Sequence, residues 1–281
     1  MLIASASNPL IKQIRALRAR KAREEAGVCW AEGIRIVAAA VEHGAAIERL
    51  VVAPDLLTSA YARDLAAAQR ARGVPYTEVS AAVFASLSLK EGPQGIGAVV
   101  RQRWTALDTL APGGELCWIA LDAAQDPGNL GTILRTGDAV GAAGIILLGH
   151  AADAYDAAAL RASMGAIFAQ RLVRASFAEL IDWKTRHSAA LIGTSDAAPT
   201  DYQALRYPHP AILLMGSERQ GLAPDQQAAC DHLVRIPMTG TSDSLNLAVA
   251  TAVALYEIYN QRRHASMGTP AGGDAGGSDA S

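Results

Sequence analysis

The stretch LVRIPMTGTSDSLNLAVATAVALYEIYN, residues 233–260, is the one around which we expect the fold to be organised. A short apolar strand at 233–236 is predicted to run into Pro237 and a polar turn at 239–243. Ser244 is predicted to cap a long helix, because a cap residue before an apolar face is a helix-start signal. The apolar residues of that face recur at helical spacing: Leu245, Val249, Ala252, Tyr256 and Tyr259. The turn between strand and helix could present backbone groups to a ligand.

Two earlier stretches are candidate partners for it: QDPGNLGTILRT at 125–136 and LLMGSERQGL at 213–222. The first follows an apolar run that ends at Leu121, and it leads into a helix that Asn129 can cap. A helix N-terminus favours anions, so this turn could bind a phosphate or a nucleotide. Neither G-x-G-x-x-G nor G-K-[ST] is present, however, and an ordinary strand-to-helix turn remains the alternative.

The second half of the chain alternates short apolar runs with helical stretches, a pattern that predicts a doubly wound parallel sheet in an α/β fold. The predicted strands are Leu116–Leu121, Gly144–Leu148, Arg171–Val173, Ala190–Gly193, Ala211–Met215 and Leu233–Ile236. The predicted helices before the last one are Leu130–Val140, Ala157–Met164, Phe177–Arg186 and Pro224–Cys230. Ligands bind at the carboxyl ends of the strands in such sheets, and the three stretches quoted above lie at such ends.

Four polar side chains in these stretches are candidates for a site, each with a simpler alternative. Arg135 is predicted to point away from the packed face of its helix, where it could hold a phosphate or a ribose oxygen, or simply pair with a surface acid. Glu218 could fix an arginine or accept a hydrogen bond from a hydroxyl, or serve as an acid before a helix. Ser244 and Asn246 could reach the same space, or serve as a helix cap and a solvent-facing amide.

The first hundred residues form a repeating α/β pattern that predicts a smaller domain. A basic helix at 5–24 opens it. We expect this domain to cover 1–105, a Gly/Pro-punctuated linker 106–115, and the second domain 116–264. Residues 265–281, rich in Gly, Ala, Ser and Asp, are predicted to be a disordered tail.

The chain has 281 residues and a net charge of −2, which points to no particular partner, but the charge is unevenly spread. The helix at 5–24 carries six basic residues and could bind nucleic acid, the alternative being a solvated helix face. These residues are Lys12, Arg15, Arg18, Arg20, Lys21 and Arg23. The three cysteines and six histidines are scattered and predict neither a disulfide framework nor a metal site. No signal-peptide or membrane-spanning run is evident, so we expect a cytoplasmic protein.

The three stretches, in this order, closely resemble the three motifs of the SpoU (TrmH-like) branch of the SPOUT RNA methyltransferases. RASMGAIF at 161–168 also looks like the segment between them, and the match covers 116–260. The N-terminal part resembles an L30e-like substrate-binding module. The resemblance implies a deep trefoil knot, S-adenosylmethionine as cofactor, and a homodimer whose site is completed across the interface. Tyr256 and Tyr259 are then candidates for that interface.

Residue by residue, the resemblance assigns two groups of site residues. The cofactor contacts would be Gly216, Ile236 and Leu245, with Thr194 and Met238 nearby. The catalytic group would be Arg135, Asn129, Glu218, Ser244 and Asn246, with Arg135 matching the family's catalytic arginine. One departure is Leu247-Ala248, where many members have Val-Ser, and it puts fine substrate contacts in doubt.

The resemblance thus implies an enzyme that transfers a methyl group from S-adenosylmethionine to a ribose 2′-hydroxyl of RNA. Ribosomal RNA is favoured over tRNA because of the appended N-terminal domain. The alternatives are a tRNA ribose methyltransferase and an RNA-binding protein that has lost catalysis, although the full polar set argues against the latter. A nucleotide-dependent oxidoreductase is disfavoured, because the dinucleotide fingerprint and an acidic ribose partner are missing.

Overall fold

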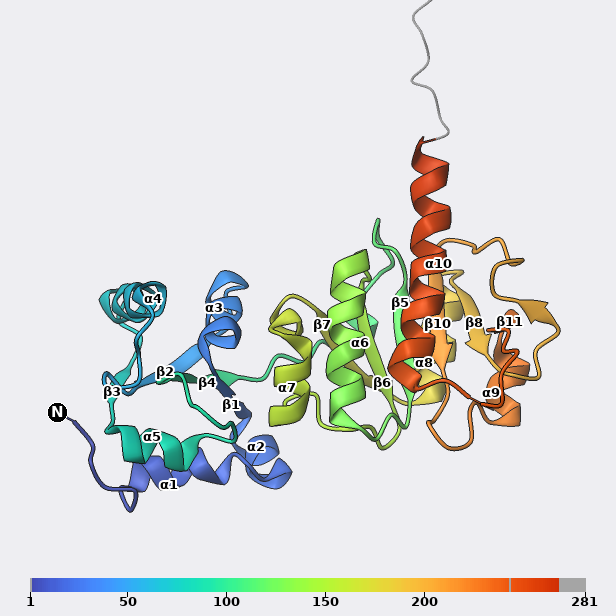
Figure 1. Ribbon diagram of the computed structural model, residues 1–281. Helices are drawn as coiled ribbons and strands as arrows, with labels where there is room; N and C mark the ends of the chain where they lie inside the picture. The colour runs from blue at the N-terminus through green and yellow to red at the C-terminus, as the bar shows by residue number, and fades with distance from the viewer. Residues whose placement is uncertain (1, 243, 268–281) are drawn as a thin grey trace, which may run out of the picture.

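The computed structural model describes residues 2–242 and 244–267, and these form two α/β domains that lie side by side (Figure 1). The smaller, N-terminal domain contains a four-stranded sheet of order β1-β4-β2-β3, in which only β2 and β3 are parallel. Its strands are β1 (Val28–Glu32), β2 (Ile47–Val52), β3 (Tyr76–Glu78) and β4 (Ile96–Arg101). The predicted tail at 265–281 falls, from residue 268 on, outside the described residues.

Helices cover both faces of the N-terminal sheet. They are α1 (Pro9–Ala16), α2 (Arg20–Ala26), α3 (Ile34–Glu42), α4 (Ala60–Ala71) and α5 (Ala81–Leu87). On one face, Ile11 of α1 and Phe84 of α5 pack against Trp30 of β1. On the other face, Val37 of α3 and Ala62 of α4 pack against Leu50 of β2. Because successive strand residues point to opposite faces, both sides of each strand are buried.

The predicted basic helix at 5–24 is two helices in the structure. Asn8 caps the first by accepting a hydrogen bond from the Leu10 N–H at 2.9 Å, and Pro9 follows at the first helical position. The chain then turns at Ala19, whose backbone is extended. Arg23 Nη1 donates to the Leu17 carbonyl at 2.8 Å and to the Arg18 carbonyl at 2.8 Å. The break is stable because this guanidinium replaces the lost intrahelical donors, a contact that helical spacing could not predict.

The larger domain contains a seven-stranded sheet of order β7-β6-β5-β10-β8-β11-β9, and every pair in it is parallel. The predicted α/β class with a parallel sheet is confirmed. Its strands are β5 (Trp118–Asp122), β6 (Gly144–Leu148), β7 (Arg171–Ala175), β8 (Ala190–Thr194), β9 (Thr200–Asp201), β10 (Ala211–Met215) and β11 (His232–Arg235). The short edge strand β9 has no counterpart among the predicted elements, because two residues carry no periodicity.

Helices form a layer on each face of this sheet. The front layer in Figure 1 consists of α6 (Pro127–Val140), α7 (Ala157–Ser163) and α10 (Leu247–Met267). Opposite it lie α8 (Phe177–Arg186) and a 3-10 turn, η1 (Leu107–Thr109). The remaining short helices are α9 (Pro224–Ala229) and η2 (Ala166–Phe168). In β5, Ile119 and Leu121 join the core under α6, whereas Trp118 and Ala120 join the core under α8.

The segment 106–115, predicted to be a linker, is instead an ordered part of the larger domain. Thr105 already pairs with Val173 of β7, and Leu107 is buried beside α8. The indole N–H of Trp183 in α8 donates to the Leu110 carbonyl at 2.9 Å. The chain therefore passes from one domain to the other at 102–104. The Gly and Pro residues mark irregular backbone correctly, but irregular backbone can still be packed.

The two domains share one hydrophobic cluster across their junction. Ala39 of α3 lies so close to Gly165 that a Cβ at position 165 would come within 2.3 Å of the Ala39 Cβ. Gly165 also has a φ of +98°, which favours glycine. The junction is thus a close-packed contact, and it holds the N-terminal domain in one place relative to the parallel sheet.

Two of the three cysteines, Cys29 and Cys117, are buried in the core. Among residues 2–242 and 244–267, no helix combines the length and the apolar character needed to cross a membrane.

Candidate active site

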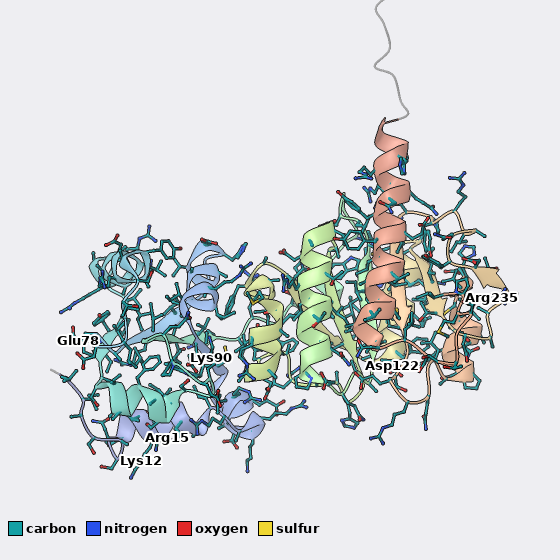
Figure 2. All side chains as sticks on the ribbon, in the orientation of Figure 1. Lys12, Arg15, Glu78, Lys90, Asp122 and Arg235 are labelled. Atoms are coloured by element: carbon teal, nitrogen blue, oxygen red, sulfur yellow. The ribbon has the colours of Figure 1, made fainter. Side chains whose placement is uncertain are left out.

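Three loops from one edge of the parallel sheet form the candidate site. They follow β5, β10 and β11, and Asp122 marks this edge in Figure 2, below the start of α10. Strand order makes β5 and β10 direct neighbours, with β8 between β10 and β11. The sequence-based expectation that these stretches meet at the carboxyl ends of their strands is confirmed.

A chain of hydrogen bonds joins the three loops, and we call it the amide relay. Asn246 Nδ2 donates to Asn129 Oδ1 at 3.0 Å, and Asn129 Nδ2 donates to Glu218 Oε1 at 2.6 Å. The direction of these hydrogen bonds is set by Asn246, because its Oδ1 already accepts from backbone N–H groups of α10 and its Nδ2 must therefore face Asn129. A carboxylate at the end of the relay completes the pattern, since it can only accept. Three predicted site residues are therefore brought together.

The cap of α10 is Asn246, and the prediction that Ser244 caps this helix is wrong. Asn246 Oδ1 accepts from the Ala248 N–H at 2.9 Å and from the Val249 N–H at 3.3 Å. The helix accordingly begins at Leu247, two residues later than expected. Ser244 lies in the preceding loop, lines the cavity described next, and has an interaction of its own. Both residue types cap helices well, so sequence alone could not choose between them.

A cavity of about 410 Å³ opens beside the relay. All five residues predicted to contact a cofactor line it: Thr194, Gly216, Ile236, Met238 and Leu245. Its further walls include Met215, Leu222, Val234 and Leu247, which were not among the predicted cofactor contacts. The lining also includes polar side chains, among them Asp196, Glu218 and Gln227. A concave site of this volume, with apolar walls and polar groups that can fix an orientation, suits a molecule of nucleoside size. The residues present thus fit S-adenosylmethionine, which has a flat base and a polar ribose and amino-acid part.

Gly216 lines this cavity and also allows a tight turn of the chain. The loop after it folds back on itself, with hydrogen bonds of 3.1 and 3.0 Å exchanged between Ser217 and Gly221. A Cβ at position 216 would come within 2.2 Å of the Gly221 carbonyl carbon. The glycine is required because it allows this return, which turns Glu218 toward Asn129.

Asp126 is a site residue that the sequence-based prediction missed. Its Oδ1 accepts from the Asn129 N–H at 2.7 Å and so caps α6, the role expected of Asn129. With its cap provided by Asp126, Asn129 keeps its side chain for the relay. The order Asp-Pro at 126–127 was the available signal, since Pro is favoured at the first helical position after a cap.

Arg135 lies apart from the relay. It is exposed, and within the described part of the chain it forms no hydrogen bond or ion pair. It lies six positions after Asn129, about 9 Å along the helix axis. It is not among the residues that line the cofactor cavity. One copy of the chain therefore does not bring together all the predicted catalytic residues.

The predicted RNA-binding residues separate into exposed and buried ones. Lys12 and Arg15 lie on the outer face of the N-terminal domain in Figure 2. Arg15 and Arg18 donate to groups of residues 86 and 88, and Arg20 and Lys21 pair with glutamates one helical turn on. Arg23 is only 3% exposed, and it forms ion pairs with Asp153 at 2.7 Å and Asp156 at 3.0 Å. The prediction that Arg23 contacts RNA is wrong, because its guanidinium is used inside the domain junction.

Comparison with known proteins places this arrangement in a family. The model of the SpoU rRNA Methylase family matches residues 117–256, and that of the MRM3-like substrate binding domain matches residues 8–98. A 23S rRNA (uridine(2479)-2′-O)-methyltransferase of Streptomyces viridochromogenes is 34% identical over 252 residues, 86% of each chain. The chain belongs to the SpoU rRNA methylase family.

A solved rRNA methyltransferase structure and a second sequence relative agree with this assignment. The AdoMet-bound rRNA methyltransferase of Sinorhizobium meliloti is 38% identical, with a TM-score of 0.84, and the match covers 94% of this chain and 98% of that one. A 23S rRNA (guanosine(2553)-2′-O)-methyltransferase of Bacillus subtilis is 28% identical and is matched over 98% of its length. The predicted family is thus confirmed. Within the described residues, no three His, Cys, Asp or Glu side chains form a group that could hold a metal.

Proposed function

We propose that this SpoU protein methylates a ribose 2′-hydroxyl of 23S-type ribosomal RNA, with S-adenosylmethionine as the methyl donor. The observation that carries the proposal is the amide relay beside a cavity of cofactor size. Ribosomal RNA is favoured over tRNA because the Streptomyces viridochromogenes and Bacillus subtilis relatives described above, which match over both domains, are named as 23S rRNA methyltransferases. We place the reaction in the cytoplasm.

The reaction breaks one bond and forms another on the same carbon. When bound in the cavity, S-adenosylmethionine would supply a methyl group from its sulfonium to the 2′-oxygen, which loses its proton as the new bond forms. Within residues 2–242 and 244–267 the Glu218 carboxylate accepts a single hydrogen bond, from Asn129, so the rest of it is available to orient the cofactor or the ribose. A guanidinium binds oxyanions through a fixed fork of N–H donors, so we assign Arg135 to holding the hydroxyl and an adjacent phosphate. The phosphate or a relay group then takes the proton, and positioning supplies much of the acceleration.

A homodimer would bring Arg135 to a relay. Arg135 is exposed on α6, and α10 beside it exposes Val249 and Tyr256. If two chains paired through α6 and α10, the contact would cover the exposed Val249 and Tyr256. It would also place Arg135 of one copy near the cofactor cavity of the other. Tyr259, the second tyrosine expected at the interface, is half-buried against the core and lies edge-on to Tyr256 at 6.1 Å. Tyr256 is therefore the better anchor.

We also propose that the last strand and helix form the deep trefoil knot of this family. The position of β11 two strands from β10, with α10 returning over α6 at the front of the sheet, supports it. The threading would hold Ile236 and Leu245 on the two sides of the cofactor cavity.

The deciding experiment maps 2′-O-methylation across total RNA from cells with and without the gene. We expect one 23S rRNA nucleotide to lose its methyl group in the deletion strain, and the purified protein with labelled cofactor to restore it. Loss of a tRNA methyl group instead would favour the tRNA alternative. An unchanged RNA methylation map would overturn the proposed function.

A further inference from the structure

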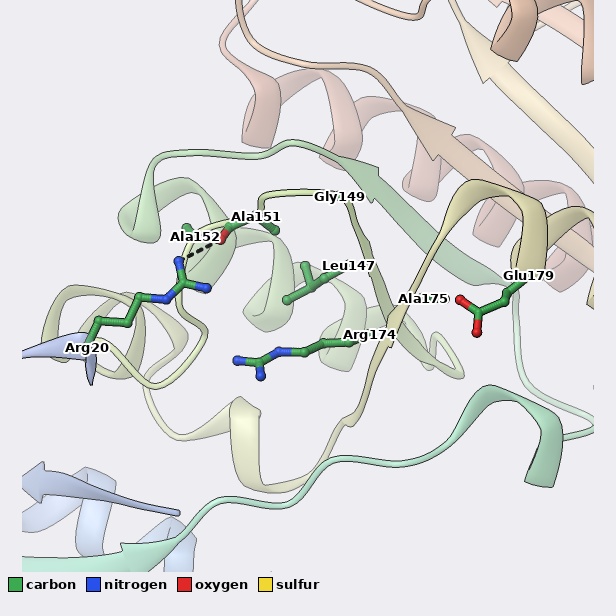
Figure 3. A pocket seen from close by; sticks show the side chains of 8 residues that line it. All are labelled: Arg20, Leu147, Gly149, Ala151, Ala152, Arg174, Ala175 and Glu179. Atoms are coloured by element: carbon green, nitrogen blue, oxygen red, sulfur yellow. Dashed lines mark hydrogen bonds between the residues drawn. The ribbon is translucent and has the colours of Figure 1, made fainter. Parts of the chain in front are cut away.

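A second cavity, of about 360 Å³, lies between the two domains at the carboxyl ends of β6 and β7. Arg20 of α2 comes from the N-terminal domain, and the other lining residues come from the larger domain. Figure 3 shows Arg20 and Glu179 at opposite ends, with the Arg174 guanidinium between them. The methyl-transfer reaction, as described above, uses none of these side chains.

Arg174 presents a flat group to this cavity. Its guanidinium carbon lies 3.8 Å from the ring centre of Trp104, which covers one face. The Trp104 ring is itself fixed, because its Nε1 donates to Gln102 Oε1 at 3.1 Å and its edge meets Tyr155 at 5.6 Å. Because the Trp104 ring is fixed, the Arg174 guanidinium stacked on it is held in a defined plane at the wall of the cavity. Bases of single-stranded RNA stack on such planes.

Arg20 supplies hydrogen-bond donors and positive charge. It donates to the Ala151 carbonyl at 3.1 Å and to Glu24 at 2.9 Å, which leaves three of its five N–H groups. The same Glu24 oxygen lies 3.7 Å from Arg174, so two guanidinium groups share one carboxylate. The Glu179 carboxylate at the far end accepts from the Ser176 N–H and hydroxyl. The Arg20 end thus keeps a net positive charge suited to a phosphate.

We propose that this cavity binds one nucleotide of the RNA substrate other than the methylated one, with its phosphate at Arg20 and its base stacked on Arg174. The inference rests on the proposed function, because it takes RNA as the substrate. The cavity lies at the same sheet edge as the relay, and β6 adjoins β5. With strands about 4.8 Å apart, the two sites are separated by on the order of 10 Å. A single strand of RNA can therefore occupy both.

The test measures binding of in vitro transcribed 23S rRNA to the full-length protein at several salt concentrations. Arg174→Lys keeps the charge but removes the plane, and we expect about tenfold weaker binding with an unchanged salt dependence. Arg20→Ala removes a phosphate contact, and we expect the salt slope to fall by about 0.7. Arg186→Ala, an exposed arginine at the end of α8, is the matched control and should bind as the wild type does.

Folding is checked by cofactor affinity and thermal midpoint, which should be equal in all variants. A second measurement leaves both arginines unchanged. RNA should quench the tryptophan fluorescence of the wild type, and in Trp104→Phe this quenching should be smaller by the share that Trp104 contributes. Equal RNA binding by Arg174→Lys, Arg20→Ala and the control would overturn the inference alone. A wild-type protein that neither binds nor methylates 23S rRNA would overturn the proposed function, and this inference with it.

Discussion

Asn129 is the residue at which the three loops meet, and each of its polar groups has a different partner. Its backbone N–H is bound by Asp126, its amide nitrogen by Glu218, and its amide oxygen by Asn246. The last two partners are 89 and 117 residues away. An amide is the only side chain of this length that can donate and accept at once, so neither Asp nor Leu could replace it.

Replacing Arg135 should separate catalysis from cofactor binding. Arg135→Ala removes an exposed side chain with no partner within residues 2–242 and 244–267, so folding and cofactor affinity should be unchanged. Loss of a group that stabilises the reacting hydroxyl should lower the methylation rate at least about a hundredfold. Single-turnover methylation of 23S rRNA measures this, with Arg161→Ala on α7 as a control of equal charge. Full activity in Arg135→Ala would remove it from the mechanism.

The cysteines should be chemically inert in the folded protein. Burial raises the pKa of Cys29 and of Cys117 from 9.0 to about 12, and burial raises that of Cys230 to about 11. Near pH 8 the thiols are protonated, and the thiolate is the reactive form. We expect an aromatic disulfide reagent to leave Cys29 and Cys117 unmodified until urea unfolds the chain. Fast native-state reaction of either thiol would contradict the burial.

The same pKa shifts predict the direction of the stability change at high pH. Above pH 9 the thiols of an unfolded chain release protons while the folded ones keep them. The folded state then binds more protons than the unfolded state. The contribution of these thiols to the free energy of unfolding should therefore be fully present below pH 9, and it should be lost as the pH rises toward 12. Urea unfolding at a series of pH values measures this. A free energy that rises over that range would contradict it.

At the scale of single elements, α10 shows what local patterns can and cannot predict. Its apolar periodicity identified the helix, but two good cap residues stood two positions apart. The choice of Asn246 follows from the bond of its amide to Asn129, which no local pattern contains. The break in the basic helix at 17–19 has the same origin, because Arg23 reaches it from the next helix and is itself held by Asp153.

Two substitutions of Asn246 should separate its roles as cap and as relay donor. Asn246→Asp keeps a capping oxygen, so the free energy of unfolding should stay within about 0.5 kcal/mol. Asn246→Ala removes the cap and should cost about 1 kcal/mol. Both lose the donor to Asn129 and should lower methylation about tenfold or more. Urea denaturation and methylation assays measure the two effects, and an active Asn246→Asp would show that the relay is dispensable.

At the scale of the whole molecule, the family motifs predicted both domains but not the way they are joined. The junction depends on Arg23, which sits in a run of exposed basic residues and looks no different from them in sequence. Its partners Asp153 and Asp156 lie more than a hundred residues away. The packed segment at 106–115 was missed for a similar reason, because its contacts to Trp183 are made across the fold.

Removing the junction arginine should destabilise the protein strongly. Arg23→Ala leaves Asp153 buried without its ion pair and should lower the free energy of unfolding by about 3–5 kcal/mol. Lys21→Ala, on the same helix but 86% exposed at its side chain, should change it by less than about 0.5 kcal/mol. Urea unfolding measures both. Equal effects of the two substitutions would show that the junction contributes nothing to stability.

A charge on the exposed stripe of α10 should dissociate the proposed dimer. Tyr256 is 47% exposed, and Tyr256→Glu would place a carboxylate in the apolar contact. Tyr61→Glu is the matched control, because Tyr61 is 54% exposed on the N-terminal domain. Analytical ultracentrifugation should give a dimer for the wild type and the control, and a monomer with little methylation activity for Tyr256→Glu. A monomeric wild type would overturn the dimer.

The amide relay also determines at which point of its synthesis the protein can become an active enzyme. Translation reaches Asn129 and Glu218 well before Asn246, and the Leu245 wall of the cavity also arrives late. When β5 and β10 have left the ribosome, the nascent chain therefore still lacks one end of the relay and one side of the cavity. If 23S rRNA is the substrate, a ribosome cannot be methylated by the unfinished chain that it is making. Messages truncated upstream of codon 246 should likewise yield no partly active enzyme.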